Sequence, residues 1–190
     1  MSEMNSIERF FVNRSAARRS LRRCDWIRRN VTIPVDAVCL EIGCGAGEMA
    51  ARFVEGFQPA RYIATDLDPR QLKEAGRNLK SKHPAETAAR VELRTADMLH
   101  LPFPDGSFDL VLAFVAIHHA GPKHRDFTNI PQALSEFRRV LRPGGVLLYS
   151  EFFHKEPIRQ WLADHGFSIS GVERGWRLES VAARKPTSST

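Results

Sequence analysis

Three glycines and a neighbouring carboxylate give the chain its clearest chemical signal. An apolar stretch in VCLEIGCGAGEMA, residues 38–50, leads directly into Gly43, Gly45 and Gly47, and a helical pattern follows at once. Glycines at such a turn allow positive φ and let a ligand lie against the backbone, while the first turn of the helix offers unpaired N–H groups. The segment predicts a backbone cradle for a small ligand, with an ordinary strand-to-helix turn as the alternative.

Three carboxylates are expected to meet beside this glycine loop. Glu41 stands two residues before Gly43, Asp66 ends the next predicted strand, and Asp97 follows the third. Because right-handed crossovers bring the carboxyl ends of parallel strands to one edge of a sheet, these side chains should converge there. Asp66 could accept hydrogen bonds from both hydroxyls of a ribose, although a turn or helix-capping role is also open because Pro69 follows. Such a set of charges favours a positively charged nucleoside over a pyrophosphate.

The elements that position these residues alternate between strand and helix. Apolar runs predict strands over residues 37–42, 62–65, 90–94, 108–114 and 146–151. Helical patterns predict helices over residues 48–55, 69–82 and 131–141. This alternation indicates a parallel sheet covered on both faces. A helix over residues 157–165 and strands over 167–173 and 177–183 end the pattern, and the short connection between these two strands makes them antiparallel.

The first 30 residues differ from the rest in charge. They hold eight Arg and carry a net charge of +5, whereas the whole chain carries +6. Apolar residues recur at helical spacing from Ile7 to Cys24, which predicts one or two amphipathic helices between about residues 5 and 30. Because the basic character is confined to this segment, it supports a nucleic-acid-binding fold only weakly. A solvated helix face, a clamp for an anionic substrate, an RNA contact and a membrane-surface contact all remain open.

The composition is that of one folded domain. The chain has 190 residues, of which 43% are hydrophobic and 26% charged, which is ordinary for a globular protein. The longest apolar run, residues 110–117, is too short for a transmembrane helix, and no secretion signal opens the chain. The three cysteines include no C-x-x-C pair, which disfavours a disulfide framework and a zinc site and favours the cytoplasm.

Four linked segments together resemble the class I S-adenosylmethionine-dependent methyltransferases. They are VCLEIGCGAG (38–47), YIATDLDP (62–69), ADMLHLPFPDGSFDLVLAFVAIHH (96–119) and ALSEFRRVLRPGGVLLY (133–149). The chain is most similar to the small-molecule enzymes typified by the ubiquinone/menaquinone and sterol methyltransferases. The resemblance covers about residues 38–151 and implies S-adenosyl-L-methionine as co-substrate. It also implies a Rossmann-like three-layer α/β sandwich, with a seven-stranded sheet that is parallel except for the last strand.

The resemblance assigns roles to individual residues. Residues Gly43 to Gly47 would carry the methionine part of the co-substrate, with Glu41 near its amino group. Asp66 would take the ribose hydroxyls, and Asp97 would accept from the adenine amino group. Leu67 would pack on the adenine, and the backbone of Met98 would lie beside it. The full set of expected cofactor-binding residues is Glu41, Gly43, Cys44, Gly45, Gly47, Asp66, Leu67, Asp97, Met98 and Phe114.

The resemblance implies methyl transfer to a small-molecule acceptor that binds near the end of the fourth strand, around residues 114–119. His118 and His119 are the candidate bases there, because imidazole titrates near neutrality, and a structural role for each is the alternative. With His124 they lack the spacing of a known metal site, so no metal is expected. The aromatic side chains that could wall an apolar pocket are Phe10, Phe11, Phe114, Phe152 and Phe153.

Other functions fit less well. The third glycine falls at position 47 and Glu48 follows it, which disfavours the G-x-G-x-x-G/A pattern of a dehydrogenase. No [DN]-P-P-[YF] follows the fourth strand and no Cys follows Cys44, which disfavours the DNA-amino, glutamine and cytosine-C5 enzymes. A non-catalytic module that binds S-adenosylmethionine or contacts RNA through the basic helix remains the alternative function.

Three regions are expected along the chain. Residues 1–30 form an Arg-rich amphipathic helical segment that acts as a lid over the cofactor crevice and turns some of its Arg toward the acceptor. Residues 31–185 form the domain that binds S-adenosylmethionine, and residues 186–190 form a disordered tail. Only the helix over residues 157–165 separates the fifth and sixth strands, so a cover for the carboxyl edge of the sheet would have to come from residues 5–30 and from residues 118–130.

Overall fold

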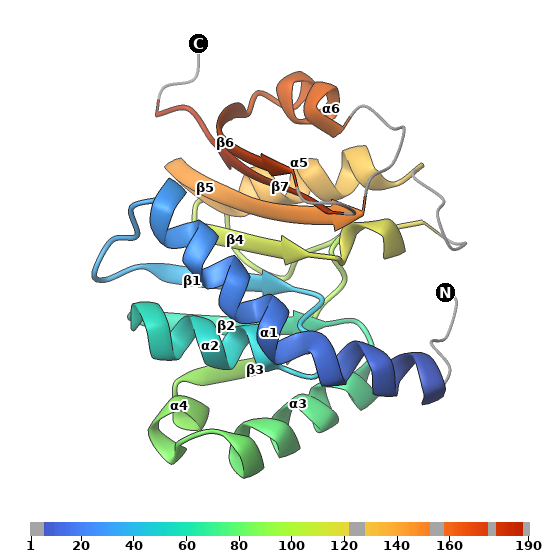
Figure 1. The fold of residues 1–190 in the computed structure, drawn as a ribbon. Coiled ribbons are helices and arrows are strands. Elements are labelled where there is room, and N and C mark those ends of the chain that lie inside the picture. The colour runs from blue at the N-terminus through green and yellow to red at the C-terminus, as the bar shows by residue number, and fades with distance from the viewer. Residues whose placement is uncertain (1–5, 122–127, 153–157, 175–177, 188–190) are drawn as a thin grey trace.

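The computed structural model describes the backbone of residues 6–121, 128–152, 158–174 and 178–187 (Figure 1). Its centre is a seven-stranded sheet with the strand order β3-β2-β1-β4-β5-β7-β6. The strands are β1 (Val38–Ile42), β2 (Arg61–Asp66), β3 (Val91–Thr95), β4 (Phe108–Phe114), β5 (Leu141–Phe152), β6 (Ser168–Arg174) and β7 (Leu178–Arg184). The pairs from β3 to β5 are parallel, and β7 runs antiparallel between β5 and β6. The predicted Rossmann-like α/β sheet with an antiparallel last strand is confirmed.

Helices cover both faces of this sheet (Figure 1). One face carries α1 (Ser6–Asn30), α2 (Glu48–Phe57) and α3 (Pro69–Lys82), and the other carries α5 (Ile130–Val140) and α6 (Ile158–Asp164). A short helix, α4 (Ala85–Ala89), precedes β3, and a 3-10 turn, η1 (Ile117–His119), follows β4. Strands β2 and β3 extend the sheet on one side of β1, and β4 and β5 extend it on the other side. Open α/β sheets bind ligands at the carboxyl ends of the two strands where this order reverses, which are β1 and β4 here.

Strand β4 is apolar at every position except Asp109 near its start, whose carboxylate accepts a hydrogen bond from the Val38 N–H and pairs with Arg142. Leu110 and Leu112 belong to the core cluster under α1 and α2, and Val111 and Ala113 belong to the cluster under α5 and α6. Successive side chains of a strand point to opposite faces, so a strand covered by helices on both faces is apolar on both sides, as β4 is from Leu110 onward.

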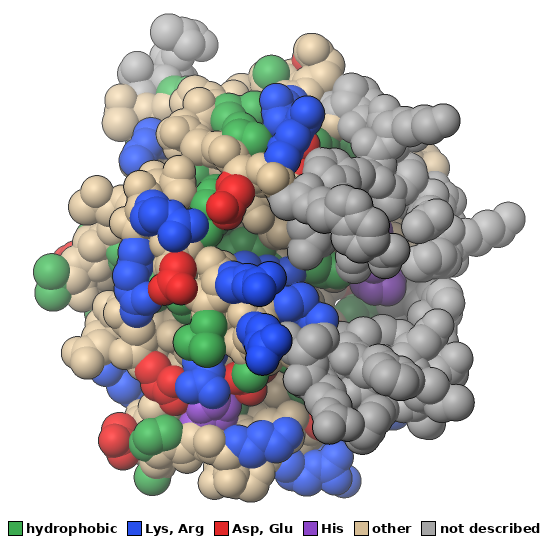
Figure 2. Space-filling model, viewed as in Figure 1, with side chains coloured by type: hydrophobic (Ala, Val, Ile, Leu, Met, Phe, Trp, Pro, Cys, Tyr) green, Lys and Arg blue, Asp and Glu red, His purple; other side chains and the backbone are tan. Residues whose placement is uncertain are grey.

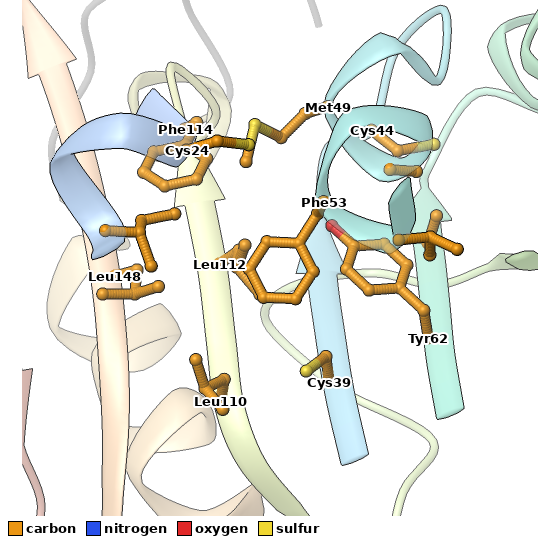
Figure 3. Packing of buried hydrophobic residues seen from close by; sticks show 14 of the residues in the cluster. Cys24, Cys39, Cys44, Met49, Phe53, Tyr62, Leu110, Leu112, Phe114 and Leu148 are labelled. Atoms are coloured by element: carbon orange, nitrogen blue, oxygen red, sulfur yellow. The ribbon is translucent and has the colours of Figure 1, made fainter. Parts of the chain in front are cut away.

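Helix α1 is one continuous helix, and its C-terminal part belongs to the core. Cys24 is buried in the same cluster as Met49 and Phe53 of α2 (Figure 3). Trp26 and Ile27 are buried in this cluster too. The opposite side of this C-terminal part, from residue 16 onward, is largely solvated, and Figure 2 shows basic side chains gathered over it. Among the described helices, none combines the length and apolar character needed to cross a membrane.

Two local features depart from the predicted elements. Strand β5 begins at Leu141 rather than at residue 146, because Gly144 and Gly145 form an irregularity within the strand instead of a loop before it. A Cβ atom at Gly145 would lie 2.9 Å from the carbonyl oxygen of Arg142, so the backbone can pass there only without a side chain. Helix α4 was not expected, since five residues are too few for a helical period to show. Residues 188–190 of the expected tail lie outside the described residues.

The docking of α1 can be measured by truncating one residue on each side of the helix. Ile27→Ala removes a fully buried side chain and should lower the free energy of unfolding by about 2–4 kcal/mol. Leu21→Ala removes a side chain that is half exposed, and it should change that energy by less than about 0.5 kcal/mol. Urea denaturation of both variants checks this, and equal effects would mean that α1 is not packed as described.

Candidate functional site

The glycine loop after β1 allows another segment or a ligand to lie close to its backbone. Gly43, Gly45 and Gly47 have φ of +67°, +51° and +81°, a region that L side chains rarely enter. A Cβ atom at Gly43 would lie 2.7 Å from the Cβ of Ala116, whereas one at Gly45 would meet nothing within 4 Å. The loop is therefore tight against the segment after β4 and open at its centre, as the cradle predicted from the sequence requires.

Asp66 ties this loop to the end of β2. Its carboxylate accepts hydrogen bonds from the N–H of Gly45 and the N–H of Asp68, each at 3.0 Å. The Cys44 N–H also donates to the Thr65 carbonyl oxygen at 2.8 Å. Burial raises the pKa of Asp66, and the two backbone hydrogen bonds oppose that rise. The expected convergence of the loop with Asp66 is therefore present.

Glu41 is a buried acid at the end of β1. Its side chain is only 3% exposed, and it accepts a hydrogen bond from the Tyr62 hydroxyl at 2.9 Å. Burial raises its pKa to about 7, although the Tyr62 hydrogen bond and the positive charge of Arg23 both favour the ionised form. A carboxyl group that is costly to ionise, at the carboxyl end of a central strand beside a glycine loop, is typical of a functional site.

Arg23 brings a positive charge from α1 to the same place. Its guanidinium lies over the Phe114 ring, 4.9 Å from the centroid. Burial lowers its pKa to about 10, a fall to which Arg19 adds and which the carboxylates of Glu41 and Glu151 oppose. One of its nitrogens, Nη2, is buried without a hydrogen-bond partner among the described residues. A buried cationic donor that lacks a partner marks a place where an anionic group can bind.

The chain turns sharply after β4, and this turn places two histidines. Val115 has φ of +58°, which is strained for a β-branched residue, and its N–H donates to the Ser150 carbonyl oxygen at 2.7 Å. His118 follows in η1 with a buried side chain, while the neighbouring His119 is exposed and lies ring to ring with it at 3.9 Å.

His118 meets an acid that the sequence analysis did not include. Its Nδ1 lies 2.8 Å from Oε2 of Glu151 at the end of β5, and Glu151 is 2% exposed. The same reasoning that selected Glu41 and Asp66 could have found it, because LLYSE is another apolar run that ends in an acid at the carboxyl edge. Arg23 was hidden among eight arginines, and nothing in the sequence distinguishes it from its neighbours.

Asp97 and Met98 lie at the end of β3, beside the end of β2. The Ala96 N–H donates to the Asp66 carbonyl oxygen at 3.2 Å, and the Asp97 carboxylate accepts from the Leu99 N–H at 2.9 Å. Met98 packs against the core cluster under α5. Leu67 is 42% exposed next to Asp66, so its apolar surface is available to a ligand.

Several expected residues are outside the part of the chain whose side chains are described. These are Phe10, Phe11, His124, Phe152 and Phe153. Within the described ranges, no group of three or more His, Cys, Asp or Glu side chains is placed to hold a metal ion.

Comparison with known proteins connects this site to a family. Residues 40–149 match the protein family described as a methyltransferase domain. The ubiquinone/menaquinone biosynthesis C-methyltransferase of Paracoccus denitrificans is 37% identical over 135 residues, which are 70% of this chain and 50% of that protein. A fatty-acid O-methyltransferase of Mycolicibacterium smegmatis is 35% identical over 122 residues, 64% of this chain and 39% of that protein. The chain thus spans about half the length, or less, of these curated relatives.

The fold has close counterparts among solved structures. A SAM-dependent methyltransferase from Aquifex aeolicus superposes with a TM-score of 0.71 at 15% identity, over 96% of this chain and 99% of that one. The family match covers more than half of the chain and includes the glycine loop, the ends of β2 and β3, and the β4 turn. The chain therefore belongs to the methyltransferase-domain family, whose co-substrate is S-adenosylmethionine.

Proposed function

We propose that the protein transfers a methyl group from S-adenosyl-L-methionine to a small-molecule acceptor. The observation that carries this proposal is a pair of opposite charges beside a glycine loop that is open at Gly45: the buried Glu41 and the half-buried Arg23, whose Nη2 is buried without a partner among the described residues. The methionine part of the co-substrate has one ammonium and one carboxylate group, and the site offers one partner of each sign. The residues present therefore fit the group.

The remaining expected residues would hold the nucleoside part. Asp66 already binds the loop through one carboxylate oxygen and the Asp68 N–H through the other, so it is rigid and can accept further hydrogen bonds from ribose hydroxyls. Leu67 offers exposed apolar surface for the adenine, and Asp97 lies at the next strand end for its amino group. S-adenosyl-L-methionine supplies an electrophilic methyl carbon on a positively charged sulfur when it is bound.

The acceptor belongs at the ends of β4 and β5. Phe114 is buried there under the Arg23 guanidinium, and the turn at Val115 brings Ala116 against Gly43. The relatives named above are a C-methyltransferase of ubiquinone/menaquinone biosynthesis and a fatty-acid O-methyltransferase, which supports a largely apolar small-molecule acceptor. The protein would align this acceptor with the methyl carbon and keep water away from it. Helix α1, through Arg23, would close this side of the crevice as a lid.

Binding of S-adenosylhomocysteine, measured by calorimetry, tests the donor half of the site. The native protein should bind it with micromolar affinity. Asp66→Ala removes the acceptor for the ribose hydroxyls and should weaken binding by roughly 1–3 kcal/mol. Asp105→Ala is the matched control, because Asp105 is highly exposed and pairs with Arg139 away from the carboxyl edge; it should leave binding unchanged. A native protein that bound NAD and not S-adenosylhomocysteine would refute the proposal.

Because Glu41 is buried, replacing it by Gln should raise the stability of the protein and weaken ligand binding. Its pKa is raised in the folded state, so the folded protein holds a proton that the unfolded chain loses, and stability falls as the pH rises from about 4.5 to above 7. Glu41→Gln removes this cost and should raise the free energy of unfolding by about 2 kcal/mol at pH 8, with little change near pH 5. Urea denaturation at the two pH values measures this difference.

The same substitution should weaken S-adenosylhomocysteine binding by roughly tenfold at pH 8, because the ammonium loses its charged acceptor. In the native protein, the affinity should rise between pH 6 and pH 8 as Glu41 ionises. Glu86→Gln is the control for both measurements, because Glu86 is an exposed residue of α4. If Glu41→Gln weakened binding equally at pH 6 and pH 8, the ionised carboxylate would not be the group that recognises the ligand.

A further inference from the structure

The side of α1 that points away from the sheet carries positive charge. Arg18 and Arg22 are exposed, and their spacing of four residues places them next to each other on one stripe of the helix. Neither has an ion pair among the described residues. Asp25 continues the same stripe, but its charge is already paired with Arg28. The two arginines are therefore free to meet an anionic partner.

A second basic stripe runs along α3. Lys73, Arg77 and Lys80 are exposed, and their spacing of four and three residues places them opposite the buried Ala75 and Leu79. None of these three cations has an ion pair with another described residue. The helix contains five basic residues and one acid, so its positive charge is not balanced within the helix.

The two stripes lie on the same face of the molecule. Helices α1, α2 and α3 form one layer over the sheet, with α2 between the other two (Figure 1). The two acids of α2, Glu48 and Glu55, are both paired with Arg52 and are not exposed, so they offset the stripes only a little. Figure 2 views this layer and shows Lys and Arg side chains over α1 and again over α3. We call the five exposed cations the basic face: Arg18, Arg22, Lys73, Arg77 and Lys80.

The positive charge of the protein is concentrated in these two helical segments. Residues 1–30 contribute +5 and α3 contributes +4 to a total of +6, so all the other residues together carry −3. A protein whose charge is so one-sided meets an anionic surface in one preferred orientation. Such a surface would contact the helical layer and not the opposite side of the sheet.

The chemistry of the basic face favours a lipid surface over RNA. Proteins that recognise single-stranded RNA stack its bases on aromatic side chains, and no aromatic side chain is exposed in the part of the chain whose side chains are described. The side chain beside the arginines of α1 is aliphatic instead: Leu21 is half exposed, next to Arg22 and three residues from Arg18. An apolar side chain between arginines allows a helix to lie in the interface of a membrane.

We infer that the basic face docks the protein on the surface of an anionic membrane. Electrostatic attraction to lipid phosphates holds the protein there, and Leu21 enters the interface between the headgroups. The inference goes beyond the proposed function and agrees with it, because a largely apolar acceptor concentrates in membranes. The helix that docks is also the one that carries Arg23 to the Phe114 ring in the site, so the membrane contact and the crevice share one element.

Flotation with lipid vesicles measures the docking directly and needs no acceptor. The native protein should bind vesicles of phosphatidylcholine that contain about one third phosphatidylglycerol, and it should not bind pure phosphatidylcholine. Binding should be lost when the salt concentration rises from about 0.1 M to about 1 M, because the Debye length falls from about 10 Å to about 3 Å. Equal binding to the two kinds of vesicle would overturn the inference.

Variants that remove charge locate the surface. Each basic side chain near an anionic membrane contributes about fivefold to the affinity. The double variants Arg18→Gln/Arg22→Gln on α1 and Lys73→Gln/Arg77→Gln on α3 should therefore each weaken vesicle binding about 25-fold. Binding that responded to only one of the two variants would show that the helices do not form one docking surface.

The matched control removes the same charge elsewhere. Arg142 at the start of β5 and Arg184 at the end of β7 are both exposed at the amino edge of the sheet. Arg142→Gln/Arg184→Gln should weaken vesicle binding less than about threefold, because charges beyond a Debye length from the membrane are screened. If this variant weakened binding as much as the other two, total charge and not the basic face would govern it, and the inference would be wrong.

Leu21→Ala distinguishes a membrane from a nucleic acid. It should weaken binding to the anionic vesicles about three- to tenfold, because less apolar surface enters the interface. It should leave any binding to a double-stranded RNA unchanged. Tighter binding to that RNA than to the vesicles, together with vesicle binding that does not respond to Leu21→Ala, would overturn the inference.

The same variants keep the docking separate from the proposed function. All of them should bind S-adenosylhomocysteine with native affinity, because none of the replaced residues lies at the glycine loop or the strand ends around it. Variants that lost this affinity together with vesicle binding would count against a separate docking surface. A native protein that bound the anionic vesicles and not S-adenosylhomocysteine would refute the proposed function and support the docking.

Discussion

The burial of Glu41 is the constraint on which the site depends. A carboxylate at the end of a fully covered strand cannot be solvated, so its charge must be balanced by other groups of the protein or its ligand. Tyr62 of β2 provides a hydrogen bond and Arg23 of α1 provides an opposite charge. The acid thereby connects three elements that are far apart in sequence, and it makes the position of α1 a part of the site's electrostatics.

The fold was predictable because its signals are local and repeated. Each central strand is an apolar run of the length a covered parallel strand needs, and each is followed by a helix whose apolar face has its own period. The glycine cluster and the acids at strand ends were equally visible, because a parallel sheet brings such ends to one edge whatever its detailed packing. The seven-stranded order and the antiparallel β7 follow from the resemblance together with the short connection before β7.

The parts that could not be predicted depend on tertiary contacts. Arg23 differs from the other arginines of α1 only in the face of the helix on which it lies, and the packing of Trp26 and Ile27 on α2 determines that face. His118 could be proposed from its residue type and Glu151 from its place at a strand end, but the contact between them becomes visible only when β4 and β5 are paired. The left-handed conformation of Val115 has no sequence signal, since a β-branched residue is among the least expected there. The start of β5 at Leu141 could not be predicted either, because it depends on a shift in the pairing of β5 with β4 between Phe108 and Leu110.

Helix α1 serves the core and the site from adjacent turns, and this fixes the spacing between Arg23 and the buried residues Trp26 and Ile27. A residue of an α-helix is rotated by about 100° from the one before it. One inserted or deleted residue between Arg23 and Trp26 would therefore swing the guanidinium away from Phe114 as long as Trp26 and Ile27 stayed in the core. The exposed arginines Arg18 and Arg22 can be replaced without affecting either the core or the site, because neither depends on them. In related chains this segment can therefore diverge by substitution, whereas insertions and deletions should be confined to the residues before Arg23 or after α1.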